Sequence, residues 1–221
     1  MSYTYDYPHP AVTVDIVIFT IDSDDFKVLL IQRDNEPFEG MWALPGGFVG
    51  PDESLRRAAW RELKEETGVN AAFLEQLGAF GHPDRDPRER VITVAYYALI
   101  PSDRLEIQAA SDAREARLFS MFDLPELAFD HAKILRRAHQ RVKDKVDEPL
   151  FALQLVTETF TLTELQRVHA VILGRPVDKR NFRKRVQGLD LLEPTGEQRR
   201  GGPHRPAKLY RVKDPDDVPY K

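Results

Sequence analysis

The sequence predicts a mixed α/β domain followed by a small domain of two helices and a two-stranded hairpin. In the first part, short Val- and Ile-rich segments alternate with two helical patterns, while the second part shows two short helical patterns before a glycine turn. Charge also divides the chain: Lys179 to Arg211 holds ten basic and three acidic residues, a net +7, which leaves −11 for the remainder of a chain whose total is −4. We place the hinge at Asp147-Glu148-Pro149, giving domains 1–148 and 149–221.

The extended segments of the first part are marked by alternating polarity and β-branched residues. The predicted strands are Ala11–Ile21, Lys27–Gln32, Met41–Leu44, Ala71–Phe80, Val91–Leu99 and Ala116–Met121. A turn at Asp22 to Asp25 joins the first two into a hairpin, and Pro45-Gly46-Gly47 stops the third. His82 to Arg88 forms a polar loop before the fifth.

Helices are predicted where apolar periodicity follows a capping residue. In the first part these are Ser54–Thr67, which Gly68 can end, and Asp130 to Lys145. In the second part they are Leu162–Leu173 after Thr161 and Lys179–Gln187 after Asp178, followed by a hairpin of Leu191–Glu193 with Ala207–Val212. Two helices and a two-stranded wing are the order of a winged helix-turn-helix domain.

The composition indicates the cellular compartment in which the protein is expected. The 221 residues include no cysteine, which excludes disulfides and thiolate metal sites and fits a reducing cytosol. The N-terminus has no apolar core of signal-peptide length, and no apolar run approaches a membrane span. We therefore expect a cytoplasmic protein with no membrane partner.

Three carboxylates share one face of the helix that begins near Ser54. Glu62, Glu65 and Glu66 are spaced i, i+3, i+4 and fall within an arc of about 100°. Their mutual repulsion would be relieved by a hard divalent cation, for which Mg²⁺ (or Mn²⁺) is the natural candidate. Taken alone, the same pattern is also typical of a solvated helix face.

The surrounding residues extend this pattern into a full motif. The motif begins with Gly, five residues, Glu, seven residues and Arg-Glu. It continues with an aliphatic residue, one residue, Glu-Glu, one residue, Gly and a second aliphatic residue. The residues that fill these places are Gly47, Glu53, Arg61, Glu62, Leu63, Glu65, Glu66, Gly68 and Val69. The segment resembles the Nudix box without a departure. The resemblance implies a Nudix α/β/α sandwich and metal-dependent cleavage of a nucleoside diphosphate linked to another group.

The resemblance also implies roles for individual residues. Glu65 and Glu66 would be metal ligands, and the backbone carbonyl of Gly46 or Gly47 would complete the inner shell. Glu62 would be a ligand or the general base, oriented by Arg61, while Glu53 would pair with Arg61. Some relatives use a glutamate from a later loop as the base, and Glu115 is the alternative here.

Beyond the box, Leu29 to Val49 and Phe80 to Ile100 resemble the ADP-ribose branch of this family, which implies AMP and ribose 5-phosphate as products. The side chains suited to that substrate are of three kinds. Arginines can bind phosphate, acids can accept from ribose hydroxyls, and aromatic rings can stack on a base. The candidates are Arg33, Arg85, Arg90, Asp84, Asp86, Phe48 and Phe80.

The basic second part indicates a nucleic-acid partner. In Lys179–Gln187, Phe182 and Val186 can face a core, leaving a basic outer face for a DNA groove, and the loop around Gly201-Gly202 can act as a wing. The candidate DNA-binding residues are Lys179, Arg180, Asn181, Arg183, Lys184, Arg199, Arg200 and Arg205. A basic face that docks on the acidic domain is the alternative.

Three segments of the second part resemble the winged-helix domain of the Nudix-related transcriptional regulators (NrtR). They are Phe160 to Gly174, Asp178 to Arg185 and Arg205 to Arg211. That resemblance implies a homodimer that binds a palindromic double-stranded operator and is released by ADP-ribose or a related nucleotide sugar. Three functions remain open. They are a Mg²⁺-dependent ADP-ribose hydrolase that also regulates transcription, a non-catalytic repressor that only senses ADP-ribose or a sugar phosphate, and a hydrolase of another nucleotide whose second domain serves dimerisation.

Overall fold

The computed structural model describes residues 6–69, 73–107, 113–199 and 206–213. Contacts divide the chain into two compact units, one of residues 1–20, 27–100 and 104–141 and one of residues 21–26, 101–103 and 142–221. The helix α2 (His131–Lys145) continues across the division at residues 141 and 142. The hinge expected at residue 148 therefore lies within the second unit.

A seven-stranded mixed sheet forms the centre of the first unit, in the order β3-β2-β1-β6-β5, with β4 on β1 and β7 on β2. Its strands are β1 (Ala11–Asp22), β2 (Asp25–Arg33), β3 (Trp42–Ala43), β4 (Gly46–Phe48), β5 (Phe73–Phe80), β6 (Val91–Leu99) and β7 (Ala113–Ser120). β1 and β6 are parallel, whereas β4 on β1, β3 and β7 on β2, and β5 on β6 are antiparallel.

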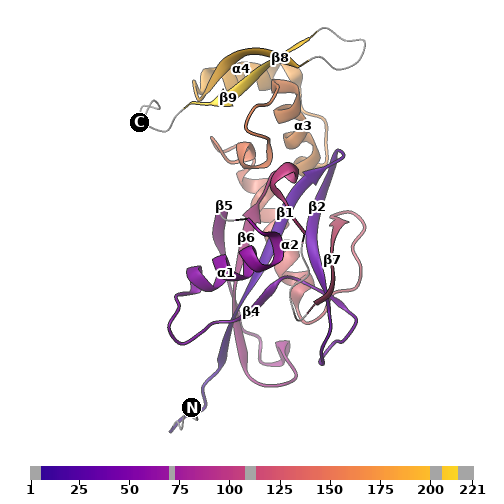
Figure 1. The fold of residues 1–221 in the computed structure, drawn as a ribbon, viewed down its shortest axis with the longest axis vertical. Helices are drawn as coiled ribbons and strands as arrows, with labels where there is room; N and C mark the ends of the chain where they lie inside the picture. Colours follow the sequence, from indigo (N-terminus) through magenta and orange to yellow (C-terminus); the bar gives the residue numbers. More distant parts are fainter. Residues whose placement is uncertain (1–5, 70–72, 108–112, 200–205, 214–221) are drawn as a thin grey trace. The chain divides into compact units, whose positions relative to one another are not determined.

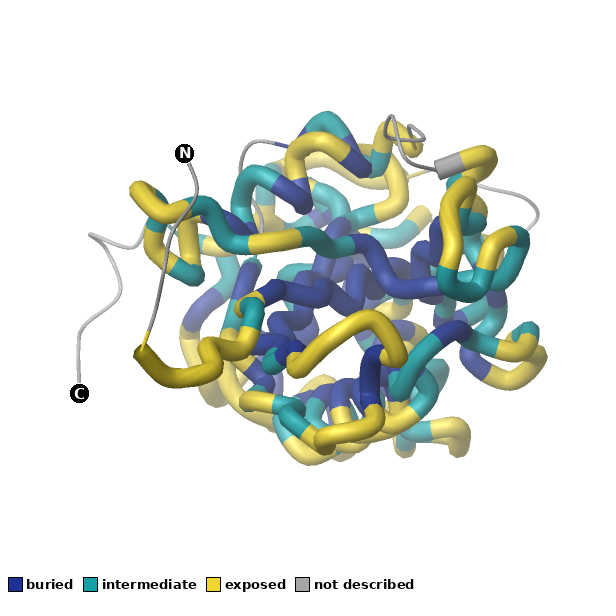
Figure 2. Tube along the Cα trace, turned by 90° about the horizontal axis from the view of Figure 1, so that it is seen from below, coloured by how far each residue is buried: buried dark blue, intermediate teal, exposed yellow. Residues whose placement is uncertain are grey.

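Helices cover both faces of this sheet (Figure 1). On one face, Val14, Ile16 and Ile18 of β1 form a fully buried cluster with Ala58 and Leu63 of α1 (Leu55–Thr67). The helix α2 lies on the other face. Figure 2 shows the buried residues gathered in the interior, with the exposed residues around them. The predicted α/β/α sandwich is confirmed.

The caps of α1 are those that the sequence predicts. Ser54 Oγ accepts a hydrogen bond from the Arg57 N–H at 3.3 Å, and the Gly68 N–H donates to the Lys64 carbonyl at 2.8 Å. Gly68 has φ 66°, a left-handed conformation that glycine adopts without steric cost.

The segment before α1 holds one strand that the sequence did not predict. β3 ends at Ala43, before Pro45, as expected, but Gly46 and Gly47 then form β4, which pairs with β1. A Cβ built at Gly46 would lie 2.2 Å from the Val14 carbonyl oxygen, so only a residue without a side chain can pair so closely.

The second unit has the predicted winged-helix order. A short 3-10 turn, η3 (Ala152–Leu155), precedes α3 (Leu162–Leu173), α4 (Lys179–Gly188) and the hairpin of β8 (Leu192–Arg199) and β9 (Ala207–Val212). Each of these elements except β8 contributes buried side chains, among them Leu155, Leu165, Val168, Ile172, Phe182, Val186 and Leu209. Among the described residues, no helix has both the length and the apolar character needed to cross a bilayer.

Candidate functional site

The three glutamates of α1 differ in burial although they share one face of the helix. Glu62 and Glu66 are 9% and 2% exposed, whereas half of the Glu65 side chain is exposed. Burial of two carboxylates so close together is unfavourable unless cations or hydrogen-bond donors compensate their charge. These carboxylates therefore mark a place where positive charge is needed.

Arg61 supplies part of that charge. Its guanidinium contacts Glu53 at 2.8 Å, Glu62 at 2.6 Å and Glu65 at 3.6 Å, and it donates to the Phe48 carbonyl at 3.2 Å. The pairs with Glu53 and Glu62 are those expected from the motif. Hydrogen bonds to Glu53 and Glu62 raise the pKa of Arg61, and the bond from Arg61, together with one from the Gly50 N–H, lowers the pKa of Glu53. Arg61 thus fixes the position of the Glu62 carboxylate.

Gly47 lets that carboxylate approach the backbone of β4 closely. A Cβ at Gly47 would lie 2.3 Å from Glu62 Oε1, so a larger residue would displace it. Across the part of the chain that the structure describes, no three His, Asp or Glu side chains already converge as an ion cage. The carboxylates of Glu62, Glu65 and Glu66 and the carbonyls beside them are nevertheless hard oxygen donors, which fit Mg²⁺ or Mn²⁺ in chemical type.

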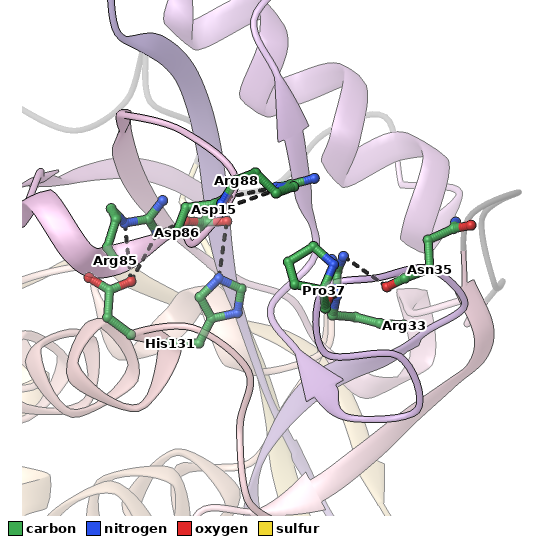
Figure 3. Close-up of polar contacts among 9 residues, drawn as sticks. Asp15, Arg33, Asn35, Pro37, Arg85, Asp86, Arg88 and His131 are labelled. Carbon is green, nitrogen blue, oxygen red and sulfur yellow. Dashed lines mark hydrogen bonds and ion pairs between the residues drawn. The ribbon is translucent and has the colours of Figure 1, made fainter.

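A pocket of about 190 Å³ opens beside Gly46 and Gly47. It is lined by residues from β1, from β2 and the loop after it, from the segment that follows β3 and includes β4, from the loop after β5, and from Phe129 and the start of α2. They are Thr13, Asp15, Ile31, Arg33, Asn35, Glu36, Leu44, Gly46, Gly47, Phe48, Arg85, Asp86, Arg88, Phe129 and His131. Several of the polar ones are drawn in Figure 3. The motif glycines therefore border both the glutamates and the pocket.

The floor of this pocket is a buried charge network. Arg85, predicted to bind phosphate, is instead 6% exposed and contacts Asp15 at 3.2 Å and Asp130 at 2.9 Å (Figure 3). Two carboxylates already take up its donors, so Arg85 fixes the pocket wall rather than offering a free cation. Its guanidinium joins β1 to the segment before α2.

His131 completes the network as a neutral side chain. Its Nδ1 accepts a hydrogen bond from the Leu44 N–H at 2.9 Å, which leaves the proton on Nε2, 3.6 Å from Asp15 Oδ1. Burial lowers the pKa of His131, although Asp15 opposes the shift.

The pocket wall combines aromatic rings with cations. Arg33 and Arg88 lie 4.8 and 5.8 Å from the centre of the Phe129 ring, and Arg88 lies 5.8 Å from the half-exposed ring of Phe48. Arg88 also contacts Asp86 at 2.7 Å, and although burial opposes ionisation, bonds from Arg88 lower the pKa of Asp86. Cations beside exposed aromatic faces suit a ligand with phosphates and a base.

Three of the predicted substrate-binding residues and the alternative base Glu115 do not line this pocket. Phe80 packs below Arg137, 5.6 Å from its guanidinium, while Asp84 and Arg90 are exposed in the loop after β5. Glu115 lies on β7 opposite Gln32. Because Ala116 and Leu118 pack against the core beneath α1, strand alternation turns Glu115 to the opposite face. The structure thus gives no support to Glu115 as the base.

The pocket also contains residues that were not predicted from the sequence, among them Asp15, Arg88, Phe129 and His131. One signal was present: Thr13 and Asp15 are polar residues at alternate positions of an otherwise apolar strand, which is unusual for a core face unless they serve a site. The others lie in segments whose spatial approach depends on tertiary folding.

A basic surface occupies the second unit. Phe182 and Val186 of α4 are buried, as predicted, whereas Lys179, Arg180, Asn181, Arg183 and Lys184 are exposed. Arg199 contacts Glu164 of α3. Arg200 and Arg205, also predicted to bind DNA, lie outside the described residues.

Two family models match the chain. The NUDIX domain matches residues 9–138, and the NrtR DNA-binding winged helix domain matches residues 152–212. One relative is the ADPR responsive transcriptional repressor NtrR of Acinetobacter baylyi, 40% identical over 93% of this chain and 83% of its own. Another is the ADP-ribose pyrophosphatase of Methanocaldococcus jannaschii, 46% identical over 59% of this chain and 73% of its own.

Solved structures of Shewanella oneidensis NrtR are also similar. The protein complexed with a 27mer DNA is 41% identical, with a TM-score of 0.81, and the match covers 91% of this chain and 93% of that one. Its NUDIX domain complexed with ADP ribose is 37% identical, with a TM-score of 0.54, over 62% of this chain and 94% of that one.

Proposed function

Because this chain belongs to the NrtR family of Nudix-domain regulators, we propose that it is an ADP-ribose-responsive transcriptional repressor that also hydrolyses ADP-ribose to AMP and ribose 5-phosphate. The domain of residues 1–148 carries the nucleotide site, and residues 149–221 carry the DNA site. The observation that supports hydrolysis most directly is the intact motif, in which Arg61 contacts both Glu53 and the buried Glu62.

ADP-ribose suits the pocket on chemical grounds. It carries two phosphates, an adenine and two riboses, and the wall offers Arg33 and Arg88 beside the rings of Phe48 and Phe129. Asp86 is ionised and lines the same wall, where it can accept from a ribose hydroxyl. The ligand that the related Shewanella NUDIX domain binds supports this assignment.

For catalysis, Glu62, Glu65, Glu66 and the Gly46 or Gly47 carbonyl would hold Mg²⁺ or Mn²⁺. A bound cation would neutralise the pyrophosphate charge and activate water for attack on phosphorus. Glu62 accepts the proton in this proposal, since Arg61 holds its carboxylate in one orientation at 2.6 Å. Arg33 and Arg88 orient the pyrophosphate, while Arg85 keeps the pocket floor rigid.

The winged helix supplies the second activity. We assign double-stranded operator DNA as its partner and a homodimer as the binding form, since paired recognition helices match paired half-sites. The repressor name of the Acinetobacter relative and the DNA complex of the Shewanella relative support this assignment. The protein would then act in the cytoplasm, where both ADP-ribose and the operator are accessible.

The test for hydrolysis is incubation of the full chain with ADP-ribose and Mg²⁺, with AMP measured as the product. The expected result is AMP formation that EDTA abolishes and that the Glu66→Gln variant loses. Full turnover by Glu66→Gln would contradict the metal site. No product with Mg²⁺ or Mn²⁺, together with saturable ADP-ribose binding, would leave the second candidate, a repressor whose Nudix domain only senses its ligand.

A further inference from the structure

The tip of the β1–β2 hairpin clusters with the second unit, although most of β1 clusters with the first. The residues of the tip are 21–26. Within the second unit, Asp24 Oδ1 contacts the Arg167 guanidinium of α3 at 3.1 Å, and more than half of each side chain is exposed. The strand β1 therefore leads from the first unit to a carboxylate that is paired with the first helix of the winged-helix domain.

The turn that presents this carboxylate is not the one that its backbone favours. Ser23 and Asp24 form a two-residue hairpin turn with φ of 53° and 63°, a left-handed conformation that Asn-Gly adopts most readily. A glycine at position 24 would fit this backbone with less strain but could not contact Arg167. A side chain kept at a strained position indicates a role for that side chain.

A second aspartate lies just beyond the end of α2. Asp147 Oδ1 contacts the Arg185 guanidinium of α4 at 2.7 Å, and His169 Nε2 of α3 lies 4.0 Å from the same oxygen. The His169 ring packs edge-on against Phe182, which anchors α4 in the core, with ring centres 4.8 Å apart. The segment after α2 is therefore bound to α4 by an ion pair and placed beside the histidine that supports this helix.

The same two elements, β1 and α2, also contribute to the pocket for which we propose ADP-ribose as the ligand. Asp15 of β1 and His131 at the start of α2 line it. Arg85 contacts Asp15 at 3.2 Å and Asp130 at 2.9 Å, so that one guanidinium connects β1 to the start of α2. A ligand that displaces this network acts on both elements, and each of them leads to an aspartate paired with an arginine of the winged-helix domain.

We propose that the ion pairs Asp24–Arg167 and Asp147–Arg185 are the contacts through which ADP-ribose in the pocket changes the affinity of the winged-helix domain for DNA. This inference rests on the ligand-responsive repression proposed above. Exposed ion pairs contribute little to the free energy of unfolding, so they can form in one state of the folded protein and break in another. A contact that differs between two states transmits a binding event from one site to the other.

The experiment measures one ratio, which we call the release ratio. It is the dissociation constant of the full-length protein for a labelled duplex from upstream of its own gene with saturating ADP-ribose, divided by the constant without ADP-ribose, both without divalent cation. For the wild-type protein we expect a release ratio of about 5 to 150. Because the release ratio compares each variant with itself, a direct effect of the substitution on DNA binding cancels.

The aspartate variants test each ion pair. Asp24→Asn and Asp147→Asn should each lower the release ratio by about two- to fivefold, which is the range expected for one exposed ion pair, and the double variant should lower it further. Glu158→Gln makes the same charge change at an exposed acid of the same unit and should keep the wild-type release ratio. Thermal stabilisation by ADP-ribose verifies that each variant is saturated.

Two further variants distinguish coupling from a structural role. Asp24→Gly removes the carboxylate but suits the left-handed turn, so it should lower the release ratio without lowering the unfolding temperature. Asp147→Asn combined with Arg185→Gln should lower the release ratio no more than either change alone, because both changes remove the same contact.

The outcomes separate this inference from the proposed function. A wild-type release ratio in either aspartate variant would overturn the role of that ion pair. An equal loss in Glu158→Gln, or effects of Asp147→Asn and Arg185→Gln that multiply, would overturn the inference as a whole. Equal DNA affinity of the wild-type protein with and without saturating ADP-ribose would instead overturn the ligand-responsive function itself.

Discussion

The ion pair between Arg61 and Glu62 holds the Glu62 carboxylate in one orientation. Arg61 Nη1 lies 2.6 Å from Glu62 Oε1 while the other guanidinium nitrogens contact Glu53 and the Phe48 carbonyl. A lysine could not reach all three acceptors, because its ammonium is a single point charge. The arginine thus connects α1 to β4 and holds the Glu62 carboxylate beside Gly47, where a Cβ would collide with it.

Replacement of Glu62 by Gln should lower kcat for ADP-ribose by a factor of about 10² to 10⁴, since the amide cannot accept the proton from water. Steady-state kinetics with excess Mg²⁺ provide the measurement, and Lys64→Gln, an exposed change on the same helix, is the control. Unchanged kcat in Glu62→Gln would remove Glu62 from catalysis.

The buried His131 should make the free energy of unfolding depend on pH. Burial lowers its pKa in the folded protein, so the unfolded chain binds the proton more readily. The free energy of unfolding should therefore fall as the pH drops below the ordinary histidine pKa of about 6.5. The charged groups around it are Asp15, Arg85, Asp130 and Arg33. In His131→Asn, which can still accept from Leu44, the decline from pH 7 to pH 5 should be shallower by thermal denaturation. Equal declines in both proteins would refute this account of His131.

The motif residues could be predicted because their positions lie on one continuous segment, Gly47 to Val69. Arg88 and His131 could not, since they lie in separate segments that only the folded chain brings together, and Asp15 was marked only by its polarity within an apolar strand. Arg85 was predicted in the right pocket but with the wrong partner, because a buried pair of acids from β1 and the segment before α2 is invisible in the local sequence.

At the scale of elements, the helices were the most predictable part of the fold. Capping residues and glycines mark the ends of α1 and α3, and the structure begins and ends them within a residue or two of the prediction. The strand β4 was missed because its glycines are typical of turns; the space beside Val14, which selects them, exists only after β1 is in place.

The cap of α3 gives a test at this scale. Thr161 Oγ1 accepts from the Glu164 N–H at 3.1 Å while the Glu164 carboxylate accepts from the Thr161 N–H at 2.8 Å. Thr161→Ala should reduce the free energy of unfolding by about 1 kcal/mol. Chemical denaturation followed through the helix signal measures it, and the exposed Thr163→Ala should change it by less than about 0.5 kcal/mol. Equal effects of the two variants would contradict the capping role.

In the molecule as a whole, the two parts of the chain carry net charges of opposite sign. The acidic first part holds the pocket for which we propose ADP-ribose as the ligand, and the segment Lys179 to Arg211 carries a net charge of +7, which suits a polyanion. The helix α2 begins at His131, in the pocket wall, and ends at Lys145, just before Asp147, which contacts Arg185 of α4. Ligand affinity and DNA affinity are thermodynamically linked if the two sites favour different states of the protein.

That linkage is the central claim, and one titration tests it most directly. The full chain is bound to a labelled duplex from upstream of its own gene, and ADP-ribose is added without divalent cation so that it stays intact. We predict saturable release of the duplex by ADP-ribose, followed by fluorescence anisotropy, and no release by AMP with ribose 5-phosphate. A complex that persists at ADP-ribose concentrations shown by thermal stabilisation to saturate the protein would contradict the account.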